Sequence, residues 1–220
     1  MTGAAKKHRM KIAAFIFDLD GVLTDTAEYH FLAWKRLAEE EKLPFSREDN
    51  EKLRGVSRRA SLDLILQGRE MSEKKIREMM DRKNGYYRAY LEKITEKDLL
   101  PGSIDLLREL QTKGFKLALA SASKNAPRVI ERLGIASFFD VIADGNSVEK
   151  TKPAPDLFLF TAEKMGVPPA YCLVVEDAEA GIAAAQAAGM YTIGIGPTDR
   201  VGSADYNYPS VSEIKLEDIL

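Results

Sequence analysis

The chain has 220 residues, of which 45% are hydrophobic and 30% are charged, and its formal net charge is −2. This length allows one large domain or one domain with an insertion, and the composition is typical of a soluble globular protein. The near-neutral charge lacks the basic footprint of a nucleic-acid-binding protein, and no run reaches the roughly 20 apolar residues of a membrane-spanning helix, so we expect neither partner.

The N-terminal residues and the single cysteine bear on the location of the protein. A basic cluster at Lys6–Arg9 is followed by only six apolar residues, too few for a signal-peptide core. We predict that residues 1–9 form a mobile tail. Cys172 cannot form an internal disulfide and suits a reducing cytoplasm, where it would be a buried small hydrophobic residue. We therefore expect a cytoplasmic protein.

The first predicted element is a strand, because Ile12–Phe17 is a six-residue apolar run too short for a typical helix. The run ends at Asp18 and Asp20, which an extended backbone points to one side. Two carboxylates this close repel each other unless a cation or a shared proton joins them. The pattern predicts a magnesium site with a nucleophilic aspartate and a second aspartate for proton transfer. Two solvated acids at a strand end are the ordinary alternative.

A helical segment follows, because no apolar strand-like run occurs between Asp25 and Leu99. Apolar residues recur at helical spacing from about Tyr29 to Leu37, and polar helices are predicted further on. From Leu100 onward, four helices each end near a glycine and each is followed by a strand. The helices are Ser103–Lys113, Asn125–Leu133, Pro155–Met165 and Glu179–Ala188, and the strands are Phe115–Ala120, Val141–Ala143, Cys172–Val175 and Tyr191–Ile195.

Four helix–glycine–strand units in succession predict an α/β fold with a doubly wound parallel sheet, a Rossmann-like core. We assign residues 1–25 and 97–220 to this core. Residues 26–96, with further helices at Ser61–Leu66 and Ser72–Leu91, form an all-helical cap inserted after the first strand.

Polar side chains stand at the ends of the predicted strands, where ligands bind in open α/β sheets. Ser121–Asn125 and Lys152 supply hydroxyls, amides and a positive charge that suit a phosphate. Glu176 and Asp177, together with Asp18, form the oxygen-rich set that Mg²⁺ prefers. Each feature also has an ordinary alternative: a turn or a helix cap in the serine segment, a surface lysine, or a solvated acidic loop.

These residue types together suit phosphoryl transfer. A carboxylate such as Asp18 can attack phosphorus and form an aspartyl-phosphate. Lys152, Ser121 and Mg²⁺ would offset the charge of the transferred group. Asp20 has the spacing of an acid/base that protonates the leaving oxygen and deprotonates the attacking group.

The Asp18-x-Asp20 motif, Ser121, Lys152 and the Glu176-Asp177 pair resemble the haloacid dehalogenase superfamily of phosphotransferases, here with a small helical cap. Five segments resemble the β-phosphoglucomutase family more closely: Asp18–His30, Arg54–Arg58, Arg82–Asn84, Ala120–Asn125 and Lys152–Asp156. The resemblance implies interconversion of β-glucose 1-phosphate and glucose 6-phosphate, with β-glucose 1,6-bisphosphate as intermediate and activator.

The resemblance also implies a role for each site residue. Asp18 would be the nucleophile and Asp20 the acid/base. The backbone carbonyl of Asp20 would bind one Mg²⁺ together with Asp18, Glu176 and Asp177. The groups that hold the transferring phosphoryl would be Ser121, Ala122 and Lys152. The groups around the distal phosphate would be Arg58, Ser123, Lys124 and Asn125. The substrate contacts of the cap would be Arg54, Gly55, Ser61 and Lys83. The hinge would hold Thr26 and His30, which govern the readiness of Asp20.

Some positions keep other interpretations. The family can carry lysine at Arg54, so the sugar contact there can differ. A structural hydrogen-bonding group on an amphipathic helix is the alternative interpretation of His30. Trp34 is interpreted as cap packing, and so are three tyrosines that we leave out of the site: Tyr86, Tyr87 and Tyr90.

We expect a monomeric enzyme acting on a small sugar phosphate. A sugar-phosphate phosphatase of the same fold is the second hypothesis, since only the attacking group differs, and the charged cap residues could form a solvated face. A non-catalytic domain that binds a phosphorylated ligand is the third, although binding alone does not need a nucleophile.

Overall fold

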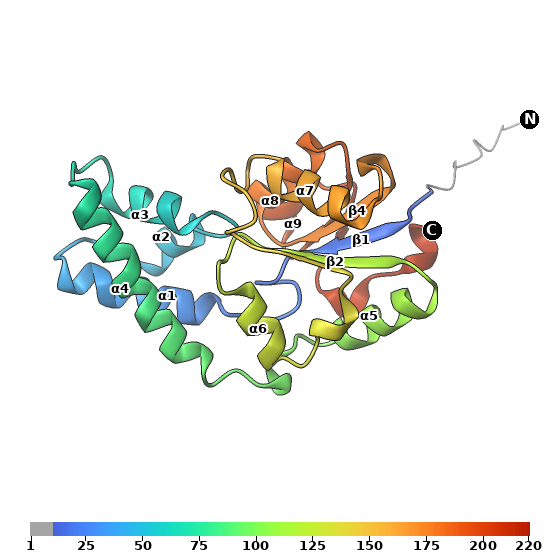
Figure 1. Ribbon diagram of the computed structural model, residues 1–220, viewed down its shortest axis with the longest axis horizontal. Helices are drawn as coiled ribbons and strands as arrows, with labels where there is room; N and C mark the ends of the chain where they lie inside the picture. The colour runs from blue at the N-terminus through green and yellow to red at the C-terminus, as the bar shows by residue number, and fades with distance from the viewer. Residues whose placement is uncertain (1–10) are drawn as a thin grey trace, which may run out of the picture.

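A parallel six-stranded sheet lies at the centre of the structure, a computed structural model that describes residues 11–220 (Figure 1). The predicted tail, residues 1–9, lies outside the described residues. The strand order is β3-β2-β1-β4-β5-β6, so the chain changes direction across the sheet between β1 and β4. The strands are β1 (Ala14–Phe17), β2 (Lys116–Ala120), β3 (Val141–Ala143), β4 (Cys172–Glu176), β5 (Tyr191–Ile195) and β6 (Tyr206–Tyr208).

Helices cover both faces of this sheet, because successive side chains of a strand point to opposite faces. Phe15 and Phe17 pack in one apolar cluster with α5 (Ser103–Thr112) and α6 (Ala126–Arg132). Ala14 and Ile16 belong to a second cluster on the other face. The helices of that face are α7 (Asp156–Met165) and α8 (Glu179–Ala187). This arrangement confirms the predicted doubly wound α/β core.

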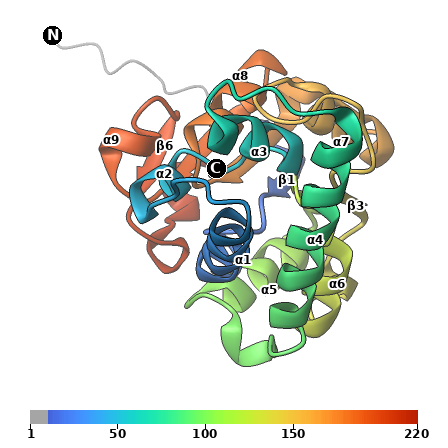
Figure 2. The same ribbon diagram turned by 90° about the vertical axis from the view of Figure 1, so that its left-hand side faces the viewer.

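Four further helices form a separate layer beyond the carboxyl end of β1 (Figures 1 and 2). They are α1 (Ala27–Glu40), α2 (Arg47–Glu51), α3 (Arg58–Leu66) and α4 (Glu73–Leu91). The apolar faces of α1, α3 and α4 form a cluster of their own that includes Trp34, Leu37, Leu62 and Met79. Serine side chains cap the N-termini of α2, α3 and α4, which explains why these polar sequences begin helices where they do.

Two C-terminal elements were not predicted from the sequence. They are α9 (Thr198–Val201) and β6, which have four and three residues. Elements this short show no measurable periodicity, and β6 exists because its backbone pairs with β5. Glu176 is the last residue of β4 rather than the first residue after it. Within residues 11–220, none of the helices combines the length and apolar character that crossing a membrane requires.

The helical layer should depend on its own apolar cluster for stability. Leu62 is fully buried in α3, so Leu62→Ala should lower the free energy of unfolding by about 2–5 kcal/mol. Leu64, on the same helix, is 50% exposed, and Leu64→Ala should cost about 0.5 kcal/mol or less. Urea unfolding of both variants measures the difference. Equal costs would show that the two leucines share the same environment.

Candidate active site

The turn after β1 brings acids from two strands together. β1 and β4 are neighbouring parallel strands, so Asp18 and Asp177 emerge at the same edge of the sheet. Gly21 has a φ of +82°, and a Cβ atom there would lie 2.2 Å from Asp177 Oδ2. Only glycine combines this backbone conformation with so close an approach. The Asp-x-Asp-Gly segment therefore folds tightly against the end of β4.

Asp18, Glu176 and Asp177 form a buried acidic cluster. Each offers a carboxylate oxygen, and these oxygens lie within 4.8 Å of one another. Burial and the charge of Asp18 raise the pKa of Glu176 to about 8 and that of Asp177 to about 7. Three buried carboxylates at this spacing repel one another, and oxygen donors are those that Mg²⁺ prefers. The donor set therefore fits a magnesium ion.

Lys152 compensates part of this negative charge through contacts with two of the three carboxylates. Its Nζ donates to Asp18 Oδ1 and, over 2.8 Å, to Glu176 Oε2. Lys152 is only 2% exposed, so it is not a surface lysine. Burial opposes its charge, but Asp18 and Glu176 outweigh that effect and raise the pKa of Lys152. The ammonium group thus stays charged and holds the Asp18 carboxylate in place.

Asp20 lies in the turn after β1 and is held by a hydrogen bond from Thr26. Burial and the nearby Asp18 charge raise the pKa of Asp20 to about 6. Thr26 Oγ1 donates a hydrogen bond to Asp20 Oδ1 and lies 3.0 Å from the Tyr87 hydroxyl. The elevated pKa lets Asp20 exchange a proton near neutral pH, as an acid/base must.

Tyr87 was left out of the predicted site, and the structure packs it in the apolar core beside two predicted site residues, Thr26 and His30. Tyr87 lines the cavity and is buried, and its ring lies 4.1 Å from the His30 ring. Sequence periodicity could not separate it from its neighbours, because all three tyrosines lie within five residues on α4. Tyr86 bonds Glu40, and Tyr90 stacks on Tyr29, so those two do act in packing.

His30, which is half-buried, and Lys83, which is buried, form a pair of nitrogen bases. Lys83 Nζ lies 2.9 Å from His30 Nδ1 and 4.8 Å from the ring centroids of both Trp34 and Tyr87. Burial and the Arg58 charge lower the pKa of Lys83, and burial with the charges of Lys83 and Arg58 lowers that of His30. His30 is thus a hydrogen-bonding group that also faces the cavity.

Asn84 of α4 connects the helical layer to the loop after β2. Asn84 Oδ1 accepts hydrogen bonds from Arg58 Nη2 over 2.8 Å and from Asn125 Nδ2 over 2.9 Å. Asn84 thereby joins two of the predicted phosphate-binding residues, although it was not among the predicted site residues. The Asn125 side chain makes no capping bond to α6, so its amide is used across the layers instead.

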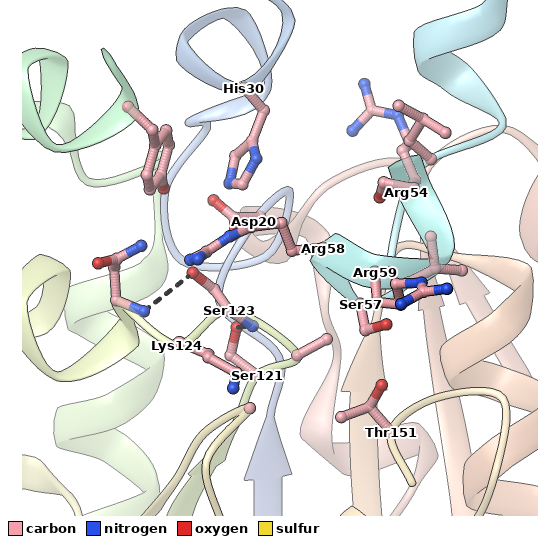
Figure 3. A pocket seen from close by; sticks show the side chains of 18 of the residues that line it. Asp20, His30, Arg54, Ser57, Arg58, Arg59, Ser121, Ser123, Lys124 and Thr151 are labelled. Atoms are coloured by element: carbon pink, nitrogen blue, oxygen red, sulfur yellow. Dashed lines mark hydrogen bonds between the residues drawn. The ribbon is translucent and has the colours of Figure 1, made fainter. Parts of the chain in front are cut away.

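A cavity of about 550 Å³ lies between the two layers. In Figure 3, Ser121 and Ser123 of the sheet layer face His30 and Arg58 of the helical layer. Most predicted site residues line it: Asp18, Asp20, His30, Arg54, Gly55, Arg58, Ser61, Lys83, Ser121, Ala122, Ser123, Lys124, Asn125 and Asp177. Thr26, Lys152 and Glu176 lie outside the lining. Thr26 bonds Asp20, and Lys152 bonds both Asp18 and Glu176.

The fold and this site agree with the comparisons to known proteins. The chain belongs to the haloacid dehalogenase-like hydrolase family, whose family model matches residues 12–189. Within it, the chain is 47% identical over 208 residues to β-phosphoglucomutase of Bacillus subtilis (strain 168), which covers 93% of this chain and 92% of that protein. The resemblance to β-phosphoglucomutase is therefore confirmed.

The chain is also similar to a second β-phosphoglucomutase and to a phosphatase. The crystal structure of β-phosphoglucomutase from Clostridium difficile superposes with a TM-score of 0.91 and 42% identity, covering 94% of this chain and 95% of that chain. A phosphorylated carbohydrates phosphatase of Thermotoga maritima is 32% identical over 94% of this chain and 96% of its own length.

The acidic cluster predicts a pH-dependent stabilisation by Mg²⁺. The folded-state pKa values of Glu176 and Asp177, about 8 and 7, exceed their ordinary values of 4.5 and 3.8. The folded protein therefore binds these protons more tightly than the unfolded chain, and that stabilisation is lost progressively as the pH rises from about 4 through 7 to 8. In EDTA, the melting temperature should fall between pH 6 and pH 8.

Mg²⁺ should restore what is lost at pH 8. At about 100 times its Kd, a ligand adds about 2.7 kcal/mol, which in a chain of this size is roughly 5–10 °C. The rise should be smaller at pH 6, where protons compete with the metal. Thermal unfolding at equal ionic strength measures both values. An equal rise at the two pH values would argue against metal binding at these carboxylates.

Proposed function

We propose that the protein is a β-phosphoglucomutase that interconverts β-D-glucose 1-phosphate and D-glucose 6-phosphate. The observation that carries the proposal is the pairing of Asp18 and Asp20 beside a buried carboxylate cluster, at the floor of a cavity whose other wall is cationic. The identity of 47% to the Bacillus enzyme over nearly the whole chain supports the same function.

In the proposed mechanism, Asp18 attacks the phosphoryl group and becomes an aspartyl-phosphate, so that one difficult transfer is split into two steps. Lys152 orients the Asp18 carboxylate through the hydrogen bond from its Nζ to Asp18 Oδ1. The hydroxyl of Ser121 and the backbone at Ala122, which line the cavity at the end of β2 beside Asp18, would hold the phosphoryl oxygens. Asp18, Asp20, Glu176 and Asp177 would hold one Mg²⁺, which would offset the negative charge of the transferring group.

Asp20 moves the proton in both half-reactions. With a pKa of about 6, it can protonate the leaving sugar oxygen and then accept a proton from the attacking hydroxyl. Thr26 holds one of its oxygens, which leaves the other for the substrate. His30, which follows Thr26 in the first turn of α1, is held by its contact with Lys83.

The helical layer supplies the preference for a sugar over water. We propose that residues 26–96 act as a cap on a core made of residues 1–25 and 97–220. A closed cap excludes water and lets a sugar hydroxyl attack the phosphorylated aspartate. The distal phosphate would be bound by Arg58, Ser123, Lys124 and Asn125. The sugar would be bound by Arg54, Gly55, Ser61 and Lys83.

The two transfer steps imply an intermediate that carries two phosphates. β-Glucose 1,6-bisphosphate would be the intermediate and, in trace amounts, the activator that phosphorylates Asp18. We further propose that the protein acts as a monomer in the cytoplasm, where Cys172 stays reduced. A sugar-phosphate phosphatase remains the second candidate, because the Thermotoga phosphatase shares 32% identity.

A product assay separates these two functions. The protein is mixed with Mg²⁺, β-glucose 1-phosphate and a trace of β-glucose 1,6-bisphosphate, and glucose 6-phosphate and free phosphate are followed together. A mutase should form glucose 6-phosphate with little free phosphate, because the closed cap excludes water. Free phosphate released in step with substrate loss would establish the phosphatase instead.

Asp18→Asn should reduce kcat more than about 10³-fold, because a carboxamide is not a nucleophile. Binding of inorganic phosphate should be retained, since the phosphate contacts lie on other side chains. Asp105→Asn makes the same chemical change on an exposed position of α5 and should leave kcat unaltered. Full activity of Asp18→Asn would disprove the assignment of the nucleophile.

A further inference from the structure

Arg200 approaches the acidic cluster from outside the cavity. It lies in α9, which follows β5, and it is not among the residues that line the cavity. Its Nη2 lies 3.7 Å from Asp177 Oδ2, and its Nη1 lies 4.0 Å from Glu51 Oε2. Arg200 therefore contacts one residue of the core and one residue of the helical layer, and no substrate position.

The fold makes room for this guanidinium at the end of β5. Gly196 has a φ of +122°, which L side chains rarely adopt, and a Cβ atom there would lie 2.5 Å from Arg200 Nη2, so the guanidinium occupies the space beside this glycine. Within residues 11–220, Arg200 Nε is buried and has no hydrogen-bond partner. The side chain is thus held in place mainly by charge, through its two terminal nitrogens.

Arg54 completes a closed ring of alternating charges from the side of the cap. Its Nη1 lies 3.2 Å from Asp177 Oδ2, and its Nε lies 2.7 Å from Glu51 Oε2. We call Glu51, Arg54, Asp177 and Arg200 the charge ring. Two of its members belong to the helical layer and two to the core, so the ring ties the layers together beside the predicted metal site.

Two guanidinium groups on one carboxylate oxygen should oppose a divalent cation on the same carboxylate. At separations of a few ångströms, charges of the same sign repel each other even at the effective dielectric constant near 20 that applies close to a protein surface. A coupling between two binding events acts equally in both directions. If the guanidinium groups weaken Mg²⁺ binding, then Mg²⁺ must weaken the ring that joins the two layers.

We propose that Arg200 is a positioning residue that lowers the Mg²⁺ affinity of Asp177 and couples metal binding to release of the cap. The inference rests on the proposed role of Asp177 as a magnesium ligand. Metal binding then loosens the charge ring and favours separation of the layers, which admits the sugar phosphate to the cavity.

The test measures Mg²⁺ binding by isothermal titration calorimetry in the absence of substrate. Arg200→Gln should lower the Kd for Mg²⁺ by about three- to tenfold, because one opposing charge is removed. Arg200→Lys keeps the charge and should stay within about twofold of the wild type. Arg108→Gln, an exposed arginine on α5, removes the same charge far from the site and serves as the control.

Small-angle X-ray scattering of the substrate-free protein measures the coupling to the cap. Mg²⁺ should increase the radius of gyration of the wild type, and the increase should be smaller in Arg200→Gln, whose ring is already broken. Weaker or unchanged Mg²⁺ binding in Arg200→Gln, or no effect of Mg²⁺ on the radius of gyration, would overturn the proposal. Because neither measurement needs turnover, both outcomes are separate from the success or failure of the proposed mutase activity.

Discussion

The structure depends on one electrostatic constraint: three carboxylates are buried at the ends of two neighbouring strands. Asp18, Glu176 and Asp177 would repel one another in this position without compensation. Lys152 supplies one buried positive charge, and a divalent cation would supply the rest. The parallel pairing of β1 with β4 makes this concentration of charge possible, because it presents both sets of acids at the same edge of the sheet.

The helical layer closes the site from the other side. Its cations face the strand ends across the cavity, and Asn84 and Arg54 contact residues of the core directly. The same acids that attract a metal therefore also attract the cap. This shared electrostatic attraction gives a physical reason why the layers can be coupled to the charge state of the site, although each layer has its own apolar cluster.

Most of the fold could be predicted from local patterns. The apolar run before Asp18 and the four helix–glycine–strand units lie close to the observed elements, because burial and helix termination leave strong signals in the residues themselves. The strand-end acids, Ser121 and Lys152 could be selected for the same reason, since parallel strands bring their carboxyl ends together. α9 and β6 were missed because their segments, Thr198–Val201 and Tyr206–Tyr208, contain no apolar run that distinguishes them from a loop.

The sequence alone determined the class of fold, the acidic motifs and the family resemblance, because these are properties of short segments with strong periodicity or distinctive chemistry. Only the tertiary structure decided which of three nearby tyrosines enters the cavity, and it selected Tyr87 through its contacts with Thr26 and His30. It also decided that Asn84 bridges the layers and that Arg200 reaches Asp177. These contacts join residues far apart in the chain, and no local pattern encodes the distances between them.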